Sequence, residues 1–159
     1  MKSMPTASRS EGAINMSQPR IVESTLEFPY SRSLGPVVGG FLAGLKEHRI
    51  LGIRSTDGKV LVPPLEYDPN TGATLDELVE VGPAGTVQSW TWVDAPTPKH
   101  PLDHPFAFAL ITPDGADTAM VHAVDAGSID KMSTGMRVQP RWRDEAHNMI
   151  DDLACWEPA

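Results

Sequence analysis

Cysteine is nearly absent from this sequence, since Cys155 is the only one in 159 residues. A single thiol excludes an internal disulfide bond and a thiolate-rich metal site. Long hydrophobic runs are also absent: the longest, residues 34–45, is about half of the roughly 20 residues that a membrane-spanning helix needs. Residues 1–20 contain no apolar signal-peptide segment. These absences predict a soluble, cytoplasmic protein without a membrane segment.

Basic residues are too few for a protein that binds a phosphate backbone. Thirteen Lys and Arg face 21 Asp and Glu, so the formal net charge is −8, and a nucleic-acid partner is not favoured. Residues 144–147 spell DEAH, but the phosphate-binding GxxxxGK[ST] loop of helicases is missing. No GxSxG motif occurs, and no base stands near Cys155 in the sequence. We therefore expect no independent enzymatic activity.

The first ordered element predicted is an amphipathic helix over residues 36–48. Pro36 suits a first helical position, and apolar residues recur at spacings of three and four. This helix packs either on its own domain or on a partner subunit. In the second case Val37, Phe41 and Gly44 would lie in the interface.

A series of β-rich segments bounded by Gly, Pro or Asp fills the second half of the chain. The segments are residues 86–93, 106–111, 118–124, 136–142 and 149–156. They do not alternate with helices, so the pattern predicts a mainly β protein with a five-stranded, Greek-key barrel, for which the OB-fold fits best. Residues 106–111 are apolar on both faces, which is typical of a central strand.

Two groups on the predicted barrel are candidates for binding. Trp90 and Trp92 project from one strand face, where they serve as core or interface anchors or, less favoured with this charge, as a platform for stacking bases. Arg137, Arg141 and Arg143 are spaced by even numbers and share a strand face. Such a stripe grips phosphates or an acidic partner, or it is simply solvated.

His100 and His104 lie four residues apart in KHPLDHP, but Pro101 and Pro105 exclude a helix there. An exposed loop is a better interpretation than a metal site.

Residues 52–72 have the outline of a two-turn zinc ribbon without ligands. Together with the helix, the Pro-Pro pair at 63–64 and the Gly-x-Val-x-Ser-x-Thr strand from Gly85, this segment resembles the thiolase-associated zinc-ribbon/OB-fold family. The family ribbon runs Cys-x-x-Cys-Gly, a stretch ending in Pro-Pro, then Cys-Pro-x-Cys-Gly. The cysteine positions correspond here to Arg54, Asp57, Asp68 and Thr71, while Gly58, Pro69 and Gly72 are kept.

The resemblance implies four parts. They are a disordered tail (1–20), a helical segment (21–50), a degenerate, metal-free zinc-ribbon or rubredoxin-like segment (51–78), and an OB-fold domain (79–159). Zinc needs thiolate or imidazole ligands, so we expect no metal. Our hypothesis is that local contacts replace it, with Arg54 pairing with Asp57 or Asp68 and the glycines retaining the turns.

The resemblance also implies a function. Family members accompany thiolase-superfamily enzymes that act on acyl-CoA thioesters, and actinobacterial members pair with lipid-transfer-type proteins that cleave steroid side-chain CoA esters by retro-aldol chemistry. We expect a non-catalytic subunit of such a hetero-oligomeric complex, with no tightly bound cofactor. Arg137, Arg141 and Arg143 would contact a CoA-ester site shared with the partner. The alternative is an OB-fold nucleic-acid-binding protein.

Overall fold

The computed structural model describes residues 24–25 and 33–159, and Ser33–Ala159 form one compact unit. The disordered tail predicted for residues 1–20 lies outside the described residues. In the part of the chain that is described, no helix has the length and apolar character needed to cross a membrane. The division into four parts stays a prediction.

The predicted helix is present as α1, Gly35–Lys46. It carries Pro36 in its first turn, where a missing backbone N–H costs nothing. The helix ends two residues earlier than predicted because His48 adopts a left-handed backbone conformation, with φ of 60°. One face of α1 is buried, through Val37, Phe41, Gly44 and Leu45.

A small antiparallel sheet follows α1. Its strands are β1 (Ile50–Arg54), β2 (Val60–Leu61) and β3 (Leu78–Val81), in the order β2-β1-β3. The two turns of the ribbon-like segment, around residues 55–59 and 68–73, lie in the connections between these strands. Glycine has positive φ in both turns, 88° at Gly58 and 71° at Gly72, as predicted. The likeness of this sheet to a zinc ribbon stays an interpretation of the sequence.

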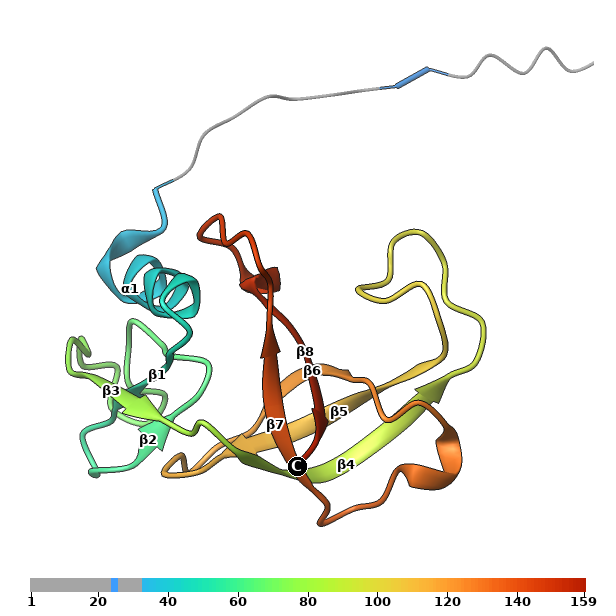
Figure 1. Cartoon of the computed structure of the whole chain (residues 1–159). Coiled ribbons are helices and arrows are strands. Elements are labelled where there is room, and N and C mark those ends of the chain that lie inside the picture. The colour runs from blue at the N-terminus through green and yellow to red at the C-terminus, as the bar shows by residue number, and fades with distance from the viewer. Residues whose placement is uncertain (1–23, 26–32) are drawn as a thin grey trace, which may run out of the picture. The chain divides into compact units, whose positions relative to one another are not determined.

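The second half of the chain forms a closed five-stranded barrel (Figure 1). Its strands are β4 (Gly85–Val93), β5 (Phe106–Pro113), β6 (Met120–Val124), β7 (Arg137–Trp142) and β8 (Leu153–Pro158). They follow one another in the order β4-β5-β6-β8-β7, and β7 pairs back to β4. Only β6 and β8 pair in parallel, at Val124 and Trp156. The predicted mainly β OB-fold is confirmed.

Three strands begin later than predicted: β7 by one residue, at Arg137, and β6 and β8 for local reasons. β6 starts at Met120, because the Thr118 hydroxyl is hydrogen-bonded to the backbone of Val62 in the small sheet. Before β8, residues Ile150–Asp152 form a short 3-10 helix, η2. A second one, η1 (Ile129–Lys131), lies between β6 and β7.

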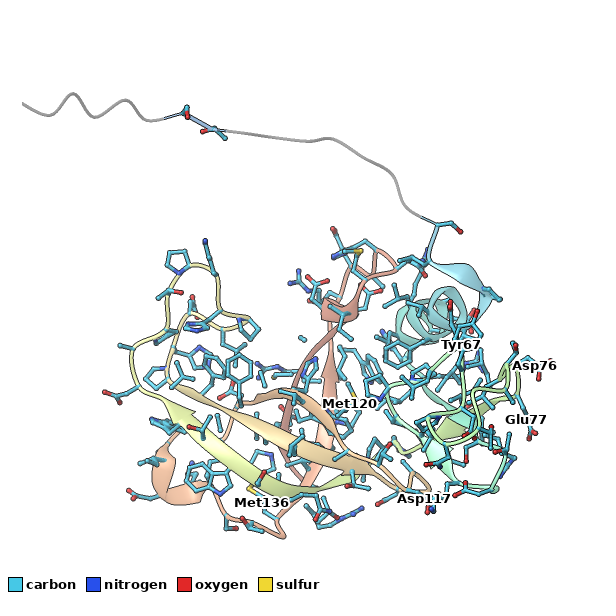
Figure 2. All side chains as sticks on the ribbon, turned by 180° about the vertical axis from the view of Figure 1, so that it is seen from behind. Tyr67, Asp76, Glu77, Asp117, Met120 and Met136 are labelled. Atoms are coloured by element: carbon cyan, nitrogen blue, oxygen red, sulfur yellow. The ribbon has the colours of Figure 1, made fainter. Side chains whose placement is uncertain are left out.

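One hydrophobic core joins α1, the small sheet and the barrel. It contains Phe41 and Leu45 of α1 and the fully buried Trp156 of β8. The loop between β5 and β6 adds polar ties to β2, since Asp117 accepts the Val60 N–H at 2.8 Å and donates its own N–H to the Val60 carbonyl. Figure 2 shows Asp117 at this junction, while Asp76 and Glu77 lie at the outer edge of the small sheet and Tyr67 lies beside α1.

Candidate partner-binding surfaces

The two turns of the ribbon-like segment are joined by one buried carboxylate. Asp68 is 2% exposed, and its Oδ2 accepts hydrogen bonds from the backbone N–H and the hydroxyl of Thr56, at 2.9 and 2.7 Å. Its Oδ1 accepts the backbone N–H groups of Asn70 and Thr71, at 2.8 and 3.0 Å. These bonds, those from Thr56 first, lower the pKa of Asp68 well below its usual range.

The predicted partner of Arg54 was wrong. Arg54 pairs with Glu77, at 2.7 Å between Nε and Oε1, and donates to the Gly58 carbonyl. Asp57 pairs with Lys59, and hydrogen bonds from Lys59 and Ser55 lower the pKa of Asp57 to about 2. Polar contacts do occupy the positions that correspond to the family's cysteines, but the centre of their network is the Asp68 carboxylate and not an ion pair of Arg54.

The helix residues predicted for a partner interface face the core of this chain instead. Val37 and Phe41 are each 4% exposed, and Gly44 is buried. A side chain at Gly44 would meet Leu51 at 2.9 Å, so its lack of a Cβ serves the contact between α1 and β1. The alternative in which α1 packs on its own domain therefore holds, and these three residues are not available to a partner.

Trp90 and Trp92 are half-buried and pack against the main core. A β-bulge between Val87 and Ser89 shifts the alternation of β4, so that both indole rings and Val87 face the interior. Rings held in this way are core anchors. They do not form an exposed platform for stacking bases.

The three arginines do not form one stripe. β7 ends at Trp142, so Arg143 lies outside the strand face that Arg137 and Arg141 share. Each guanidinium has an acidic partner within the chain: Arg137 pairs with Asp114, Arg141 with Asp125, and Arg143 with Asp151. All three side chains remain 42–48% exposed.

The DEAH residues 144–147 lie in the loop between β7 and η2, as expected for a connecting segment. Within the described ranges, one group has metal-binding geometry: His147, Asp151 and Asp152. Its carboxylates already have other partners. Asp152 accepts the backbone N–H groups of His147, Asn148 and Met149, and Asp151 pairs with Arg143.

The sequence did not reveal the environment of His104. This histidine bridges two carboxylates, with Nδ1 3.1 Å from Asp103 and Nε2 3.2 Å from Asp125. Arg141 reaches the same Asp125 oxygen at 3.1 Å. These partners come from separate elements, so only the folded register brings them together.

An uncharged patch on the outside of the barrel was also not predicted. It is a shallow hollow of about 280 Å³ on β4, β5 and β6. We call it the uncharged barrel face; its lining residues are Ser89, Trp90, Thr91, Phe108, Ala109, Leu110 and Val121. Leu110 and Val121 pair across neighbouring strands and are 38% and 64% exposed. Contiguous exposed apolar side chains of this kind mark contact surfaces.

Comparisons with known proteins agree with this geometry. Residues 78–143, which include four of the five barrel strands, match the family model of the ChsH2 C-terminal OB-fold domain. The barrel is therefore an OB-fold similar to the ChsH2 C-terminal domain. No curated protein sequence matches the chain.

Two solved structures resemble the chain beyond the barrel. The Ltp2–ChsH2(DUF35) aldolase matches at 23% identity with a TM-score of 0.58, over 80% of this chain and 98% of the other. A DUF35-family protein of unknown function from Sulfolobus solfataricus matches at 22% identity with a TM-score of 0.54, over 67% and 77%. At these identities the likeness shows the fold.

Proposed function

We propose that this chain is a non-catalytic accessory subunit of a thiolase-superfamily, lipid-transfer-protein-like enzyme acting on acyl-CoA thioesters, in the retro-aldol cleavage of steroid side chains. The observation that carries the proposal is the likeness to the Ltp2–ChsH2 aldolase, which spans 98% of the matched chain. The family model matched by residues 78–143 supports the same role.

The chemistry of the described side chains supports a subunit that does not react by itself. Cys155 is fully buried, and burial raises the pKa of its thiol to about 11, which makes it a poor nucleophile. In the proposed complex the partner supplies the reacting groups.

The uncharged barrel face is the proposed docking surface for the partner subunit. Its lining residues carry no charge, whereas the formal charge of the chain is −8, so association there brings no like charges together. Interface cores are depleted of charge and enriched in aromatic side chains, which fits Phe108. The arginines 137, 141 and 143 keep their proposed role as contacts to the CoA ester, from outside this docking surface.

Co-expression with a thiolase-like protein encoded beside this chain tests the proposal. We expect one complex by size-exclusion chromatography, cleaving an acyl-CoA ester that neither chain cleaves alone. Val121→Glu puts a charge on the uncharged barrel face at a 64% exposed position and is expected to prevent assembly. The matched control is Leu65→Glu, at a 44% exposed position on the small-sheet side, which should leave the complex intact.

Two results would contradict the proposal. If the chains elute separately, the accessory role fails. If both glutamate variants assemble equally well, the role survives but the docking surface is wrong. Salt-dependent binding of a single-stranded oligonucleotide by the isolated chain would instead favour the nucleic-acid alternative.

A further inference from the structure

The connection between β4 and β5, residues 94–105, is a long loop with few ties to the barrel. Four of its residues are prolines, which lack a backbone N–H donor. Leu102 packs against a small apolar cluster of the buried residues Phe106, Ala123 and Cys155. The ring of His100 packs edge-on against Phe106 and Phe108, with centroids 5.8 and 6.1 Å apart. The loop therefore covers this cluster.

The ion pair that fastens the loop to the barrel depends on one proton. His104 meets Asp103 of the loop through Nδ1 and Asp125, just after β6, through Nε2. A carboxylate only accepts hydrogen bonds, so both contacts need an N–H on the histidine, and only the imidazolium has two. Neutral His104 keeps one donor: it either loses the bond to Asp125 or keeps it without the charge attraction and turns a ring lone pair toward Asp103.

We propose that residues 94–105 form a protonation-controlled cover over the cluster of Phe106, Ala123 and Cys155. The cover is closed while the imidazolium of His104 bridges Asp103 and Asp125, and it opens when His104 is neutral. This inference does not depend on the proposed function.

The other charged groups around His104 determine what happens when His104 loses its proton. Asp125 also pairs with Arg141 of β7, and Arg141 lies 3.8 Å from Glu157 of β8. Asp125 therefore keeps a cationic partner when His104 is neutral, so the loop is released without leaving a buried unpaired charge on the barrel.

Hydrogen bonds to Asp103 and Asp125 raise the pKa of His104 above its ordinary value of 6.5. A group whose pKa is raised in the closed state favours closure fully below its ordinary pKa. That contribution is lost as the pH rises through the raised value. We expect the cover to be closed near pH 6 and to open toward pH 8 and above.

The second histidine of the loop has the opposite requirement. His100 Nδ1 accepts the Thr97 backbone N–H at 2.8 Å, so this bond needs Nδ1 without a proton. This contact lies within the loop and does not join it to the barrel.

Cys155 is the only cysteine, so its modification reports on the cover. The full chain is treated with 4,4′-dithiodipyridine between pH 5.5 and 8.5. Each rate is divided by that of the same chain unfolded in urea at the same pH, which removes the pH dependence of the thiol itself. We expect the normalised rate to rise between about 3-fold and about 20-fold, as for the loss of one or two exposed ion pairs.

Three variants distinguish opening of the cover from a general loss of stability. His104→Gln should remove the pH step and react at the high rate throughout. Asp103→Asn changes a fully exposed side chain, so the fold is kept, and it should shrink the step and move it to lower pH. The control is His147→Gln, which removes another exposed histidine paired with an aspartate and should keep the step.

Three results would overturn the proposal. The first is a flat wild-type profile, and the second is a step that survives in His104→Gln. The third is a modification rate that depends on urea as steeply as global unfolding does, because Cys155 would then react through the unfolded chain.

Discussion

The carboxylate of Asp68 accepts two hydrogen bonds from Thr56, twelve residues earlier, at 2.9 Å from the backbone N–H and 2.7 Å from the hydroxyl. Asn70 and Thr71 donate to its other oxygen. One buried anion therefore connects the turn after β1 to the turn at residues 68–73. It does so at one of the positions where the resembled family has a cysteine.

Replacing Asp68 should loosen the small sheet. Asp68→Asn removes the charge and turns an amide donor toward other donors, so we expect the melting temperature to fall by roughly 5–10 °C. The control is Asp76→Asn, at an exposed position of the same segment. Thermal unfolding followed by circular dichroism measures both, and equal effects would contradict the role of Asp68.

The contribution of Asp68 should also depend on pH. Its pKa is lowered on folding from an ordinary value of 3.8, so the stabilisation is present above that value and is lost as the pH falls through the lowered one. The difference in melting temperature between the wild type and Asp68→Asn should therefore be largest near neutral pH and shrink in strong acid. A difference that grows below pH 3.8 would exclude this account.

The ribbon interpretation makes a prediction about metal. With cysteine at all four positions that correspond to the family's cysteines (Arg54→Cys, Asp57→Cys, Asp68→Cys and Thr71→Cys), the turns should bind one Zn²⁺ per chain. Substitution by Co²⁺ should give the spectrum of tetrahedral thiolate coordination. The wild type should bind neither ion, because no thiolate is present there. A four-cysteine chain that folds but binds no zinc would show that the turns do not have ribbon geometry.

The order of elements could be predicted from the sequence because it depends on local patterns. Helical spacing located α1, and turn residues separated the five barrel strands. The predictions that failed depend on the register of the strands. The bulge after Val87 decides which way Trp90 and Trp92 face, and pairing of β1 with β3 places Glu77 beside Arg54. Neither the bulge nor the β1–β3 pairing can be recognised from residues that are close together in the sequence.

The interpretation of β5 shows a second limit. Its residues are apolar on both faces, and the sequence predicted a central strand. β5 does lie between β4 and β6, yet its outward Leu110 is 38% exposed beside Val121 of β6. Hydrophobicity alone does not distinguish a residue buried in its own core from one placed for contact with another molecule.

Arg137 can act through CoA or through its own chain, and two variants distinguish these roles. It donates to both Asp114 oxygens, at 2.8 and 2.5 Å, and to Thr86 at 2.8 Å. If Arg137 contacts the CoA ester, Arg137→Ala should raise KM of the complex roughly 3- to 10-fold at unchanged kcat. Asp114→Asn should not raise it, because the guanidinium remains. Arg49→Ala is the control for loss of an exposed charge. An equal rise of KM in Arg137→Ala and Asp114→Asn would assign Arg137 a structural role only.

Gly85 begins β4 where the barrel closes onto β5, and the packing there explains why a glycine stands at this position. A Cβ at Gly85 would lie 2.9 Å from the Ile111 side chain and 3.0 Å from the Thr112 carbonyl oxygen. Since the oxygen belongs to backbone, the strands must move apart, and Gly85→Ala should lower the free energy of unfolding by about 1–3 kcal/mol. Gly39→Ala is the matched control: it lies within α1 with no atom within 4 Å of its Cβ, so it should raise that free energy by about 0.5–1 kcal/mol. Urea unfolding of both variants measures the two changes, and a neutral or stabilising Gly85→Ala would show that closure of the barrel at β4 tolerates a wider strand spacing than this structure has.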